Sequence, residues 1–295
     1  MVWPTEAAWR ATVPALVERC VARWGLELGA EYSGGTAAFV ARARTADGVD
    51  AVLKVSLPHR EARDEAEALR RWDGRGAVRL LARDEDEPFA LLLERCEPGT
   101  TLASRDDLTA DARLEVAAGL LSRLWGTAGP VAAYETVGAV AAEWADLLEE
   151  RMRVLAPPFD PGLVARGASL LRALPGTATR EVVVHGDYNP GNVLAATREP
   201  WLVIDPKPML GDPGYDLCPL LVQVDDPFLH AEPTRVLRER VDLLAASTGE
   251  PAERVLAWAV ARMVEAALWF VSRSELDAGR EDLRRAEVLL GLLEG

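Results

Sequence analysis

Two patterns of apolar residues follow one another along this chain. Before residue 98, short apolar runs indicate β-strands, and after it apolar residues recur mainly at the spacing of amphipathic helices. A first helix is expected over about residues 5–24. The later helices are expected over residues 108–125, 140–155 and 163–174, with three more between residues 234 and 293. The pattern therefore predicts a small part containing a sheet, followed by a larger helical part.

Short apolar runs indicate where individual strands lie. In the first part they are residues 51–55 and 89–93, and a charged helix beginning near His59 is expected between them. Three more short strands are expected inside the helical region, over residues 181–184, 192–195 and 201–204. These three runs enclose the polar residues that are most informative about chemistry.

The loop after the first of these three strands reads His-Gly-Asp-Tyr-Asn-Pro-Gly-Asn. It places a carboxylate, Asp187, and an amide, Asn192, five residues apart, and the Pro-Gly pair between them favours a tight turn. A second carboxylate, Asp205, ends the last apolar run. Each residue type alone is common in ordinary hairpin turns, so the informative signal is the combination of strand, loop, strand and Asp.

This combination suits phosphoryl transfer from a metal-bound nucleotide. Such a transfer depends on aligning the reacting oxygens and neutralising phosphate charge. Asp187 is therefore predicted to accept the proton of an acceptor hydroxyl. Asn192 and Asp205 are predicted to hold Mg²⁺, which prefers oxygen ligands. His185 is expected to brace the loop by hydrogen bonding.

The same segment resembles the catalytic region of the aminoglycoside phosphotransferase family, which shares the fold of the eukaryotic protein kinases. Asp-Pro-Lys-Pro from Asp205 and Gly-Asp-Pro-Gly-Tyr-Asp-Leu from Gly211 are similar to its streptomycin and hydroxyurea branch. The resemblance covers about Tyr32 to the C-terminal helices. It implies an α+β, protein-kinase-like fold with ATP between two lobes. A small N-terminal lobe with an antiparallel sheet would span residues 1–97, and a larger, mainly helical lobe residues 98–295.

A lysine inside the run at residues 51–55 fits this resemblance. Lys54 would be costly to bury without a partner. In kinase-like folds such a lysine contacts the α- and β-phosphates and pairs with a Glu on the following helix. Glu65 lies beside the apolar stripe of that helix and matches the family pattern Glu-Ala-x-x-Leu, so it is the predicted partner. Glu61 and Glu67 are the alternatives.

Two further segments are expected to contact the nucleotide. One is the loop formed by Ser33, Gly34 and Gly35. Its glycines would let backbone N–H groups approach phosphates, and a plain hairpin turn is the alternative. The other follows the second strand-like run, where the order of elements resembles the hinge between kinase lobes. The backbone near Glu94 and Cys96 is expected there to bind the adenine.

Composition narrows the class of function. The chain has 47 Asp and Glu against 33 Lys and Arg, which disfavours nucleic acid and anionic membranes as partners and is compatible with a cationic small molecule. No run has the length of uncharged apolar sequence that a membrane span needs, and the N-terminus lacks signal-peptide features. The odd number of cysteines favours reduced thiols in a cytoplasm. We expect a cytoplasmic monomer or dimer.

The acceptor-binding residues are assigned from position. Asp212 and Tyr215 follow the predicted metal ligand closely, and Glu265 and Trp269 share one helix face through their four-residue spacing. Asp212 could equally brace the structure, and Trp269 could belong to the core. The resemblance implies that Asp216 braces the catalytic loop through its backbone.

Two departures from the wider families affect the expected mechanism. Asn189 stands where protein kinases have Lys and many aminoglycoside kinases have His, so Lys207 is expected to assist Lys54 and the metal. Asp205 is followed by Pro-Lys, which argues against a protein-kinase switch.

We therefore expect an ATP- and Mg²⁺-dependent kinase that phosphorylates a hydroxyl of a small molecule and confers antibiotic resistance. The expected acceptor is a streptomycin-type aminoglycoside or aminocyclitol, or hydroxyurea. A metabolic kinase of an amino sugar and a nucleotide-binding pseudokinase that acts as an interaction module are the alternatives.

Overall fold

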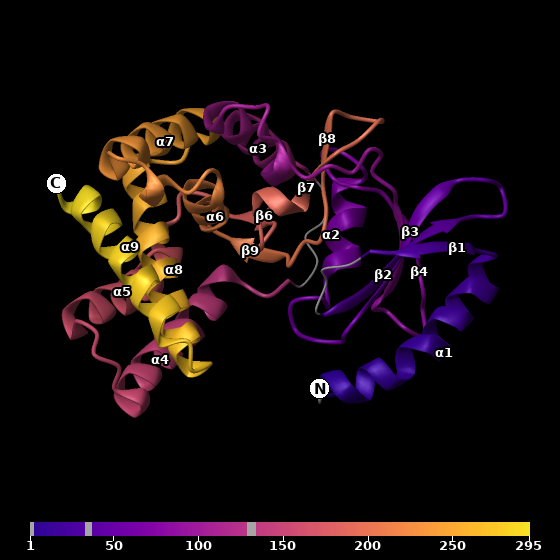
Figure 1. The fold of residues 1–295 in the computed structure, drawn as a ribbon, viewed down its shortest axis with the longest axis horizontal. Helices are drawn as coiled ribbons and strands as arrows, with labels where there is room; N and C mark the ends of the chain where they lie inside the picture. The colour runs from indigo at the N-terminus through magenta and orange to yellow at the C-terminus, as the bar shows by residue number, and fades with distance from the viewer. Residues whose placement is uncertain (1–2, 33–36, 129–133) are drawn as a thin grey trace. The chain divides into compact units, whose positions relative to one another are not determined.

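The computed structural model describes residues 3–32, 37–128 and 134–295, which form two compact units (Figure 1). The first unit comprises the described residues within Met1–Thr101, Thr127–Ala132 and Val193–Pro208. The second comprises those within Leu102–Gly126, Ala133–Asn192 and Met209–Gly295. The segment that carries Asp205 therefore groups with the N-terminal residues, although it follows them by more than ninety positions in the chain.

The first unit is built on a five-stranded antiparallel sheet in the order β1-β2-β3-β5-β4. Its strands are β1 (Glu27–Glu31), β2 (Ala38–Arg44), β3 (Asp50–Ser56), β4 (Leu80–Arg83) and β5 (Ala90–Glu94). The predicted strands at residues 51–55 and 89–93 are thereby confirmed as β3 and β5. In the central strand, Lys54 faces Val40 on one side and Leu91 on the other, so its side chain starts from the middle of the sheet.

Two helices accompany this sheet. Helix α1 (Glu6–Trp24) begins at the predicted position, where the Thr5 hydroxyl caps the N–H of Ala8, and its Cys20 packs into the core formed by the sheet. Helix α2 (Glu65–Trp72) begins later than the predicted His59. Among residues 59–63 only Ala62 is buried, so no apolar face would hold an earlier turn against the sheet.

The three short strands of the predicted catalytic region are also present, and they pair in two separate ways. Strands β7 (Val193–Ala195) and β8 (Trp201–Val203) form an antiparallel hairpin that belongs to the first unit. Strand β6 (Val182–Val184) pairs antiparallel with β9 (Met209–Gly211) in the second unit. The loop that follows β6 and the residues that follow β8 are therefore positioned by different units.

The second unit is mainly helical, as predicted. Its α-helices are α3 (Ala110–Trp125), α4 (Val137–Leu155), α5 (Pro161–Ala173), α6 (Leu217–Gln223), α7 (Pro233–Thr248), α8 (Ala252–Ser272) and α9 (Leu276–Glu294). Short 3₁₀ turns are η1 (Leu102–Ser104), η2 (Pro175–Thr177), η3 (Pro190–Asn192), η4 (Pro213–Asp216) and η5 (Pro227–Leu229). Helix α6 was not predicted because six of its seven residues are buried, which leaves no amphipathic pattern to recognise.

Helix α8 is the centre of the second unit, and α9 runs beside it (Figure 1). The break between them falls at residues 273–275. Gly279 lies within α9, where a Cβ would meet the carbonyl oxygen of Ala267 at 2.5 Å, so this glycine allows close helix packing. Among the described residues α8 alone has the length and apolarity of a membrane span, but 61% of that window is buried, as in a core helix.

Candidate functional site

Lys54 and Glu65 form the buried part of a charged cluster in the first unit. Lys54 on β3 is 7% exposed, and Glu65 at the start of α2 is 2% exposed. The Nζ of Lys54 donates to the two carboxylate oxygens of Glu65 at 2.7 and 2.8 Å. Of the three candidate partners, the structure therefore pairs Lys54 with Glu65 and not with Glu61 or Glu67.

Asp205 and Lys207 complete this cluster. Asp205 follows β8 with a φ of 57°, a left-handed backbone conformation that Asp tolerates better than most residues. One of its carboxylate oxygens, Oδ1, accepts from Lys54 Nζ at 2.5 Å, and the other, Oδ2, contacts Lys207 Nζ at 2.8 Å. Two ammonium groups thus contact the two oxygens of one carboxylate.

The charges of this cluster shift one another's pKa values. Burial acts to lower the pKa of Lys54, but the carboxylates of Glu65 and Asp205 outweigh it and raise that pKa. Burial acts to raise the pKa of Asp205, but Lys54 and Lys207 hold it well below the usual range of a carboxyl group. Asp205 therefore remains an ionised carboxylate throughout the neutral pH range, which is the form that binds a cation.

The loop after β6 belongs to the second unit and carries the predicted base. The Nδ2 group of Asn189 donates to Asp187 Oδ1 at 3.2 Å, and that of Asn192 donates to the backbone oxygen of Asp187 at 2.9 Å. The turn η3 brings Asn192 back toward Asp187. Because Asn192 donates through Nδ2, its Oδ1 is the atom with which it could ligate a metal.

Asp216 fixes the backbone of this loop. Its carboxylate, 1% exposed, accepts from the N–H groups of His185 and Gly186 at 2.8 Å each and from Trp125 Nε1 at 3.1 Å. Gly186 has a φ of 85°, a conformation that glycine adopts without strain. Burial raises the pKa of Asp216 to about 6, although these three donors act to lower it. The bracing role implied for Asp216 is present in the structure.

Two predicted acceptor-binding residues are structural instead. The carboxylate of Asp212, 1% exposed, accepts from Arg254 Nε at 2.9 and 3.0 Å, from Gly214 N at 2.9 Å and from Trp258 Nε1. Tyr215 is 2% exposed, and its ring packs edge-on against Trp258. Neither side chain presents a surface to a ligand, so their assignment as acceptor-binding residues is corrected.

The other two acceptor candidates lie four residues apart on α8 and differ in exposure. Trp269 is 41% exposed, so the alternative that it belongs to the core is wrong. The guanidinium of Arg273 lies 4.9 Å from its ring centroid. Glu265 pairs with Arg151 at 3.1 Å, and burial raises the pKa of Glu265. The Trp269 ring and the Glu265 carboxylate therefore each already contact a guanidinium group, of Arg273 and of Arg151 respectively.

Of the two residues expected to contact the nucleotide at the hinge, Glu94 is engaged within the sheet and Cys96 is not. Glu94 donates its N–H to the carbonyl of Arg79, and its carboxylate accepts from Arg79 N and from Arg198. Glu94 is thus committed to the sheet, and Cys96 is left as the predicted adenine contact. Burial raises the pKa of the Cys96 thiol to about 12, so it remains a neutral thiol. The remaining candidates, Ser33, Gly34 and Gly35, lie outside the described residues.

Arg198 was missed by the sequence analysis, because an arginine in a turn carries no distinguishing signal. It lies between β7 and β8 and donates to the Glu94 carboxylate at 2.7 and 2.9 Å. It also donates to the carbonyls of Gly74 at 2.6 Å and Ala77 at 3.0 Å, and to Glu199 at 2.9 Å. One guanidinium thus ties the hairpin that precedes Asp205 to the end of β5.

The oxygen donors suit Mg²⁺ better than a transition metal. The Asp205 carboxylate and the Asn192 amide oxygen are hard ligands, and Mg²⁺ is commonly held by one or two such groups together with phosphates and water. Among the residues that the structure describes, no group of three or more His, Cys, Asp or Glu side chains could hold a metal alone. A metal at Asp205 would therefore take its further ligands from water, and from phosphates where a nucleotide is bound.

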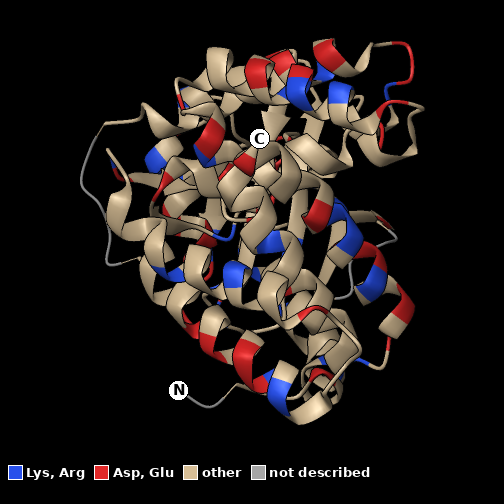
Figure 2. Cartoon of the chain, turned by 90° about the vertical axis from the view of Figure 1, so that its left-hand side faces the viewer, with Lys and Arg blue, Asp and Glu red and all other residues tan. Residues whose placement is uncertain are grey.

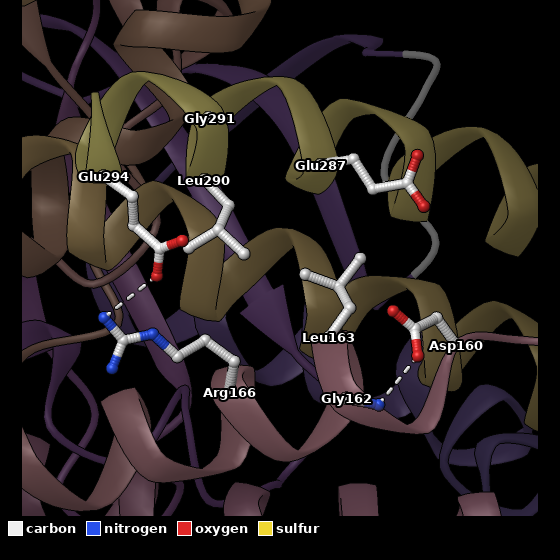
Figure 3. Close-up of a pocket in the computed structure, with 8 residues that line it drawn as sticks. All are labelled: Asp160, Gly162, Leu163, Arg166, Glu287, Leu290, Gly291 and Glu294. Atoms are coloured by element: carbon white, nitrogen blue, oxygen red, sulfur yellow. Dashed lines mark hydrogen bonds and ion pairs between the residues drawn. The ribbon is translucent and has the colours of Figure 1, made fainter.

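A shallow hollow of about 430 Å³ lies apart from these residues, between α5 and α9 of the second unit (Figure 3). Glu294 and Arg166 form an ion pair of 3.5 Å across it, and Asp160 accepts from the N–H of Gly162 as the helix cap. Arg166, Glu294 and Asp160 thus have structural partners. Acidic and basic residues also share the same helices elsewhere, so the negative net charge is not gathered on a single element (Figure 2).

Comparison with known proteins gives consistent matches. The sequence profile of the family described as aminoglycoside/hydroxyurea antibiotic resistance kinase matches residues 23–273. A streptomycin 6-kinase from Streptomyces glaucescens is 40% identical over 263 residues, covering 89% of this chain and 84% of that protein. A hydroxyurea phosphotransferase from Kitasatospora aureofaciens is 39% identical over 283 residues, covering 95% of this chain and 79% of that protein.

Solved structures confirm the expected fold. The choline kinase of Streptococcus pneumoniae superimposes with a TM-score of 0.66 at 17% sequence identity, covering 95% of this chain and 99% of that one. The same protein has also been crystallised with AMP. At this level of identity the likeness establishes the kinase-like architecture, with an antiparallel sheet and a mainly helical part.

Proposed function

Because this chain belongs to the family of aminoglycoside and hydroxyurea antibiotic resistance kinases, we propose that it transfers the γ-phosphoryl group of ATP to a hydroxyl of a streptomycin-type aminoglycoside. The family makes it a phosphotransferase enzyme. The identity of 40% to a streptomycin 6-kinase over most of both chains supports the acceptor class. The observation that carries the chemistry is the ionised Asp205 between two ammonium groups, because such a cluster suits phosphates and a metal.

The residues of the first unit are proposed to bind the nucleotide. Lys54, oriented by Glu65, would contact the α- and β-phosphates, and Lys207 would add positive charge near the group being transferred. Asp205 and Asn192 would hold Mg²⁺, which neutralises phosphate charge when bound. The nucleotide lobe would consist of the described residues within 1–97 together with the β7–β8 hairpin. The catalytic lobe would consist of the other residues within 98–295.

Asp187 is proposed as the catalytic base. Its carboxylate accepts from Asn189, and its backbone oxygen accepts from Asn192, so its orientation is set before an acceptor arrives. It would accept the proton of the attacking hydroxyl as the new phosphate ester bond forms. Asp216 would keep the loop in place through the backbone of His185 and Gly186.

Trp269 and Glu265 are proposed to contact the acceptor. An exposed aromatic ring beside a carboxylate suits a cationic group, because the ring face and the carboxylate both attract positive charge. Hydroxyurea is the second candidate acceptor, since the hydroxyurea phosphotransferase is 39% identical over 95% of this chain. We propose action in the cytoplasm, without nucleic acid or membrane as partner.

The experiment that tests this proposal is ADP release by the purified protein with Mg-ATP and a panel of streptomycin, other aminoglycosides, hydroxyurea and amino sugars. We expect the highest kcat/KM with streptomycin. Preference for hydroxyurea would select the second candidate, and preference for an amino sugar would indicate a metabolic kinase. Binding of Mg-ATP without turnover of any acceptor would contradict the enzyme proposal in favour of a pseudokinase.

A further inference from the structure

Lysine is almost absent from this chain. Of 33 basic residues only Lys54 and Lys207 are lysines, and all the others are arginines. Both lysines contact the same carboxylate, Asp205. Where a positive charge alone is needed, this chain uses arginine, so these positions mark a requirement for a compact ammonium group with rotatable donors. The buried ion pair with Glu65 explains why an ammonium group is needed at position 54. It does not explain why one is needed at position 207.

The two lysines differ in how firmly they are held. Lys54 donates to both oxygens of Glu65 as well as to Asp205, and its side chain is 9% exposed. Lys207 contacts Asp205 Oδ2 at 2.8 Å and the backbone oxygen of Asp205 at 3.4 Å, and its side chain is 19% exposed. The Asp205 side chain itself is 36% exposed, so solvent species can reach it. Lys54 is therefore tied to a second, buried carboxylate, whereas Lys207 is the more exposed of the two ammonium groups on Asp205.

We propose that Lys207 and the divalent cation use the same carboxylate oxygen of Asp205 in turn. This inference rests on the proposed function, because it assumes that Asp205 ligates the metal. A dication on Oδ2 cannot share that oxygen with an ammonium group, because the two positive charges would lie within a few ångströms. Binding of the cation displaces the Lys207 ammonium, and the phosphate oxygens of the nucleotide then receive it.

The exchange explains why arginine would not serve at position 207. A guanidinium has a planar fork that can hold both carboxylate oxygens at once, and it would block the cation. The Lys207 ammonium contacts one oxygen of the Asp205 carboxylate and can leave it by rotation of its side chain. The exchange also couples the two ligands, since the nucleotide provides the displaced ammonium with a new partner. Metal and nucleotide should therefore bind with positive cooperativity.

The test measures metal binding without turnover. Affinity of the full-length protein for Mn²⁺ is determined by calorimetry, with and without ADP, for the wild type, Lys207→Met and Lys207→Arg. Without ADP we expect about tenfold tighter binding for Lys207→Met and about tenfold weaker binding for Lys207→Arg, as removal or strengthening of one competing charge pair implies. Lys207→Met should also show weaker cooperativity with ADP than the wild type.

A spectroscopic readout follows from the low lysine content. Selective ¹³C labelling of lysine gives side-chain NMR signals from two residues, and Lys207→Met assigns them. Mg²⁺ should shift the Lys207 signal strongly and leave Lys54 near its position. A Lys54 signal that stays distinct from that of the unfolded chain in each variant shows that the first unit is folded. Arg105→Met, which removes one charge from an ion pair with Asp107 in the second unit, controls for net charge.

Equal or weaker Mn²⁺ binding by Lys207→Met would overturn the exchange, as would unchanged binding by Lys207→Arg. Asp205→Ala separates this failure from that of the proposed function. If Asp205→Ala binds Mn²⁺ as the wild type does, Asp205 is not the metal ligand and the proposed function loses its metal site. If Asp205→Ala loses the metal but the Lys207 variants do not differ, the exchange alone is wrong.

Discussion

Two aspartates of this protein have different contacts, and those of Asp205 support its proposed role in binding a cation. The Asp187 carboxylate accepts from the amide of Asn189, whereas the Asp205 carboxylate contacts the ammonium groups of Lys54 and Lys207. The cations beside Asp205 hold its pKa well below the usual range of a carboxyl group, so Asp205 remains ionised and is suited to bind a cation.

Replacing Asp187 by Asn should remove the base without removing the nucleotide contacts. We expect kcat to fall by about 10³-fold or more, because general base catalysis contributes on the order of 10²–10⁴-fold and the loop also positions the hydroxyl. The affinity for Mg-ADP, measured by calorimetry, should change by less than about twofold, since about 0.4 kcal/mol corresponds to that ratio. Asp146→Asn, on an exposed ion pair of α4, is the control. Turnover within tenfold of the wild type would exclude Asp187 as the base.

Asp216 should give stability and activity opposite dependences on pH. Its pKa is raised to about 6 in the folded protein, so the folded state holds this proton more tightly than the unfolded chain. Its contribution to the free energy of unfolding is therefore full below about pH 4 and is lost as the pH rises to about 6. Activity should rise over the same interval, because the ionised carboxylate accepts all three N–H donors of the loop.

This dependence can be checked by comparing pH–rate profiles with urea unfolding at each pH. In Asp216→Asn the acid limb near pH 6 should be absent and activity uniformly low. Asp282→Asn removes another carboxyl whose pKa burial raises to about 6, on α9. That variant should keep the acid limb. An acid limb that persists in Asp216→Asn would assign it to a different group.

At the scale of elements, the β7–β8 hairpin shows how a short piece of sheet is held in position. Three-residue strands supply little pairing of their own. Arg198 compensates by joining the hairpin to Glu94 and to the carbonyls of Gly74 and Ala77. Because the chain reaches Asp205 directly from β8, the position of the Asp205 carboxylate depends on this anchor.

Arg198→Ala should therefore weaken both stability and metal-nucleotide binding. The pair with Glu94 is mostly buried, with side chains 24% and 18% exposed, and removing one partner of such a pair costs about 3–5 kcal/mol. Arg172→Ala, in an ion pair 40% and 54% exposed, should cost less than about 1 kcal/mol. Urea unfolding and calorimetry with Mg-ADP provide the measurements.

A double-mutant cycle distinguishes this anchor from a general loss of packing. With Glu94→Gln as the second change, the coupling energy to Arg198 should be at least about 1 kcal/mol, as expected for a buried, bidentate charge pair. Additive effects of the two substitutions would contradict the assignment of Arg198 as a positioning residue.

At the scale of the whole molecule, ligand binding and stability should be linked. The nucleotide contacts predicted for Lys54, Glu65 and Asp205 join β3, α2 and the segment after β8, which are far apart in the sequence. A ligand that binds only the folded protein stabilises it by about 2.7 kcal/mol at a hundred times its Kd. Saturating Mg-ATP should therefore raise the Tm of the wild type by several degrees.

Asp205→Ala should lose the part of this stabilisation that requires Mg²⁺. Thermal unfolding with ATP and EDTA gives the metal-independent part of the stabilisation. Thermal unfolding with ATP and Mg²⁺ gives the total stabilisation. In the variant the two values of Tm should coincide within about a degree, because the interaction with the metal is worth little without its carboxylate ligand. A full Mg²⁺-dependent rise in Asp205→Ala would remove Asp205 from the metal site.

The sequence by itself determined the parts that depend on local patterns. Helical spacing and short apolar runs located most of the elements that the structure shows, including β3 and the long helices of the second unit. The spacing of Asp187, Asn192 and Asp205 indicated the family, and the matched family profile confirmed it. These features are local because turn residues and apolar periodicity act within a few positions of one another.

Only the tertiary structure decided which polar side chains are already engaged. Asp212 is occupied by Arg254 and Trp258, which lie more than forty positions further along the chain, and Trp269 is exposed on a helix that is otherwise largely buried. The anchoring role of Arg198 and the pairing of both lysines with one carboxylate likewise depend on distant partners. A polar residue has the same identity in the sequence whether it braces the fold or faces a ligand. Its burial and its partners are set by how the elements pack.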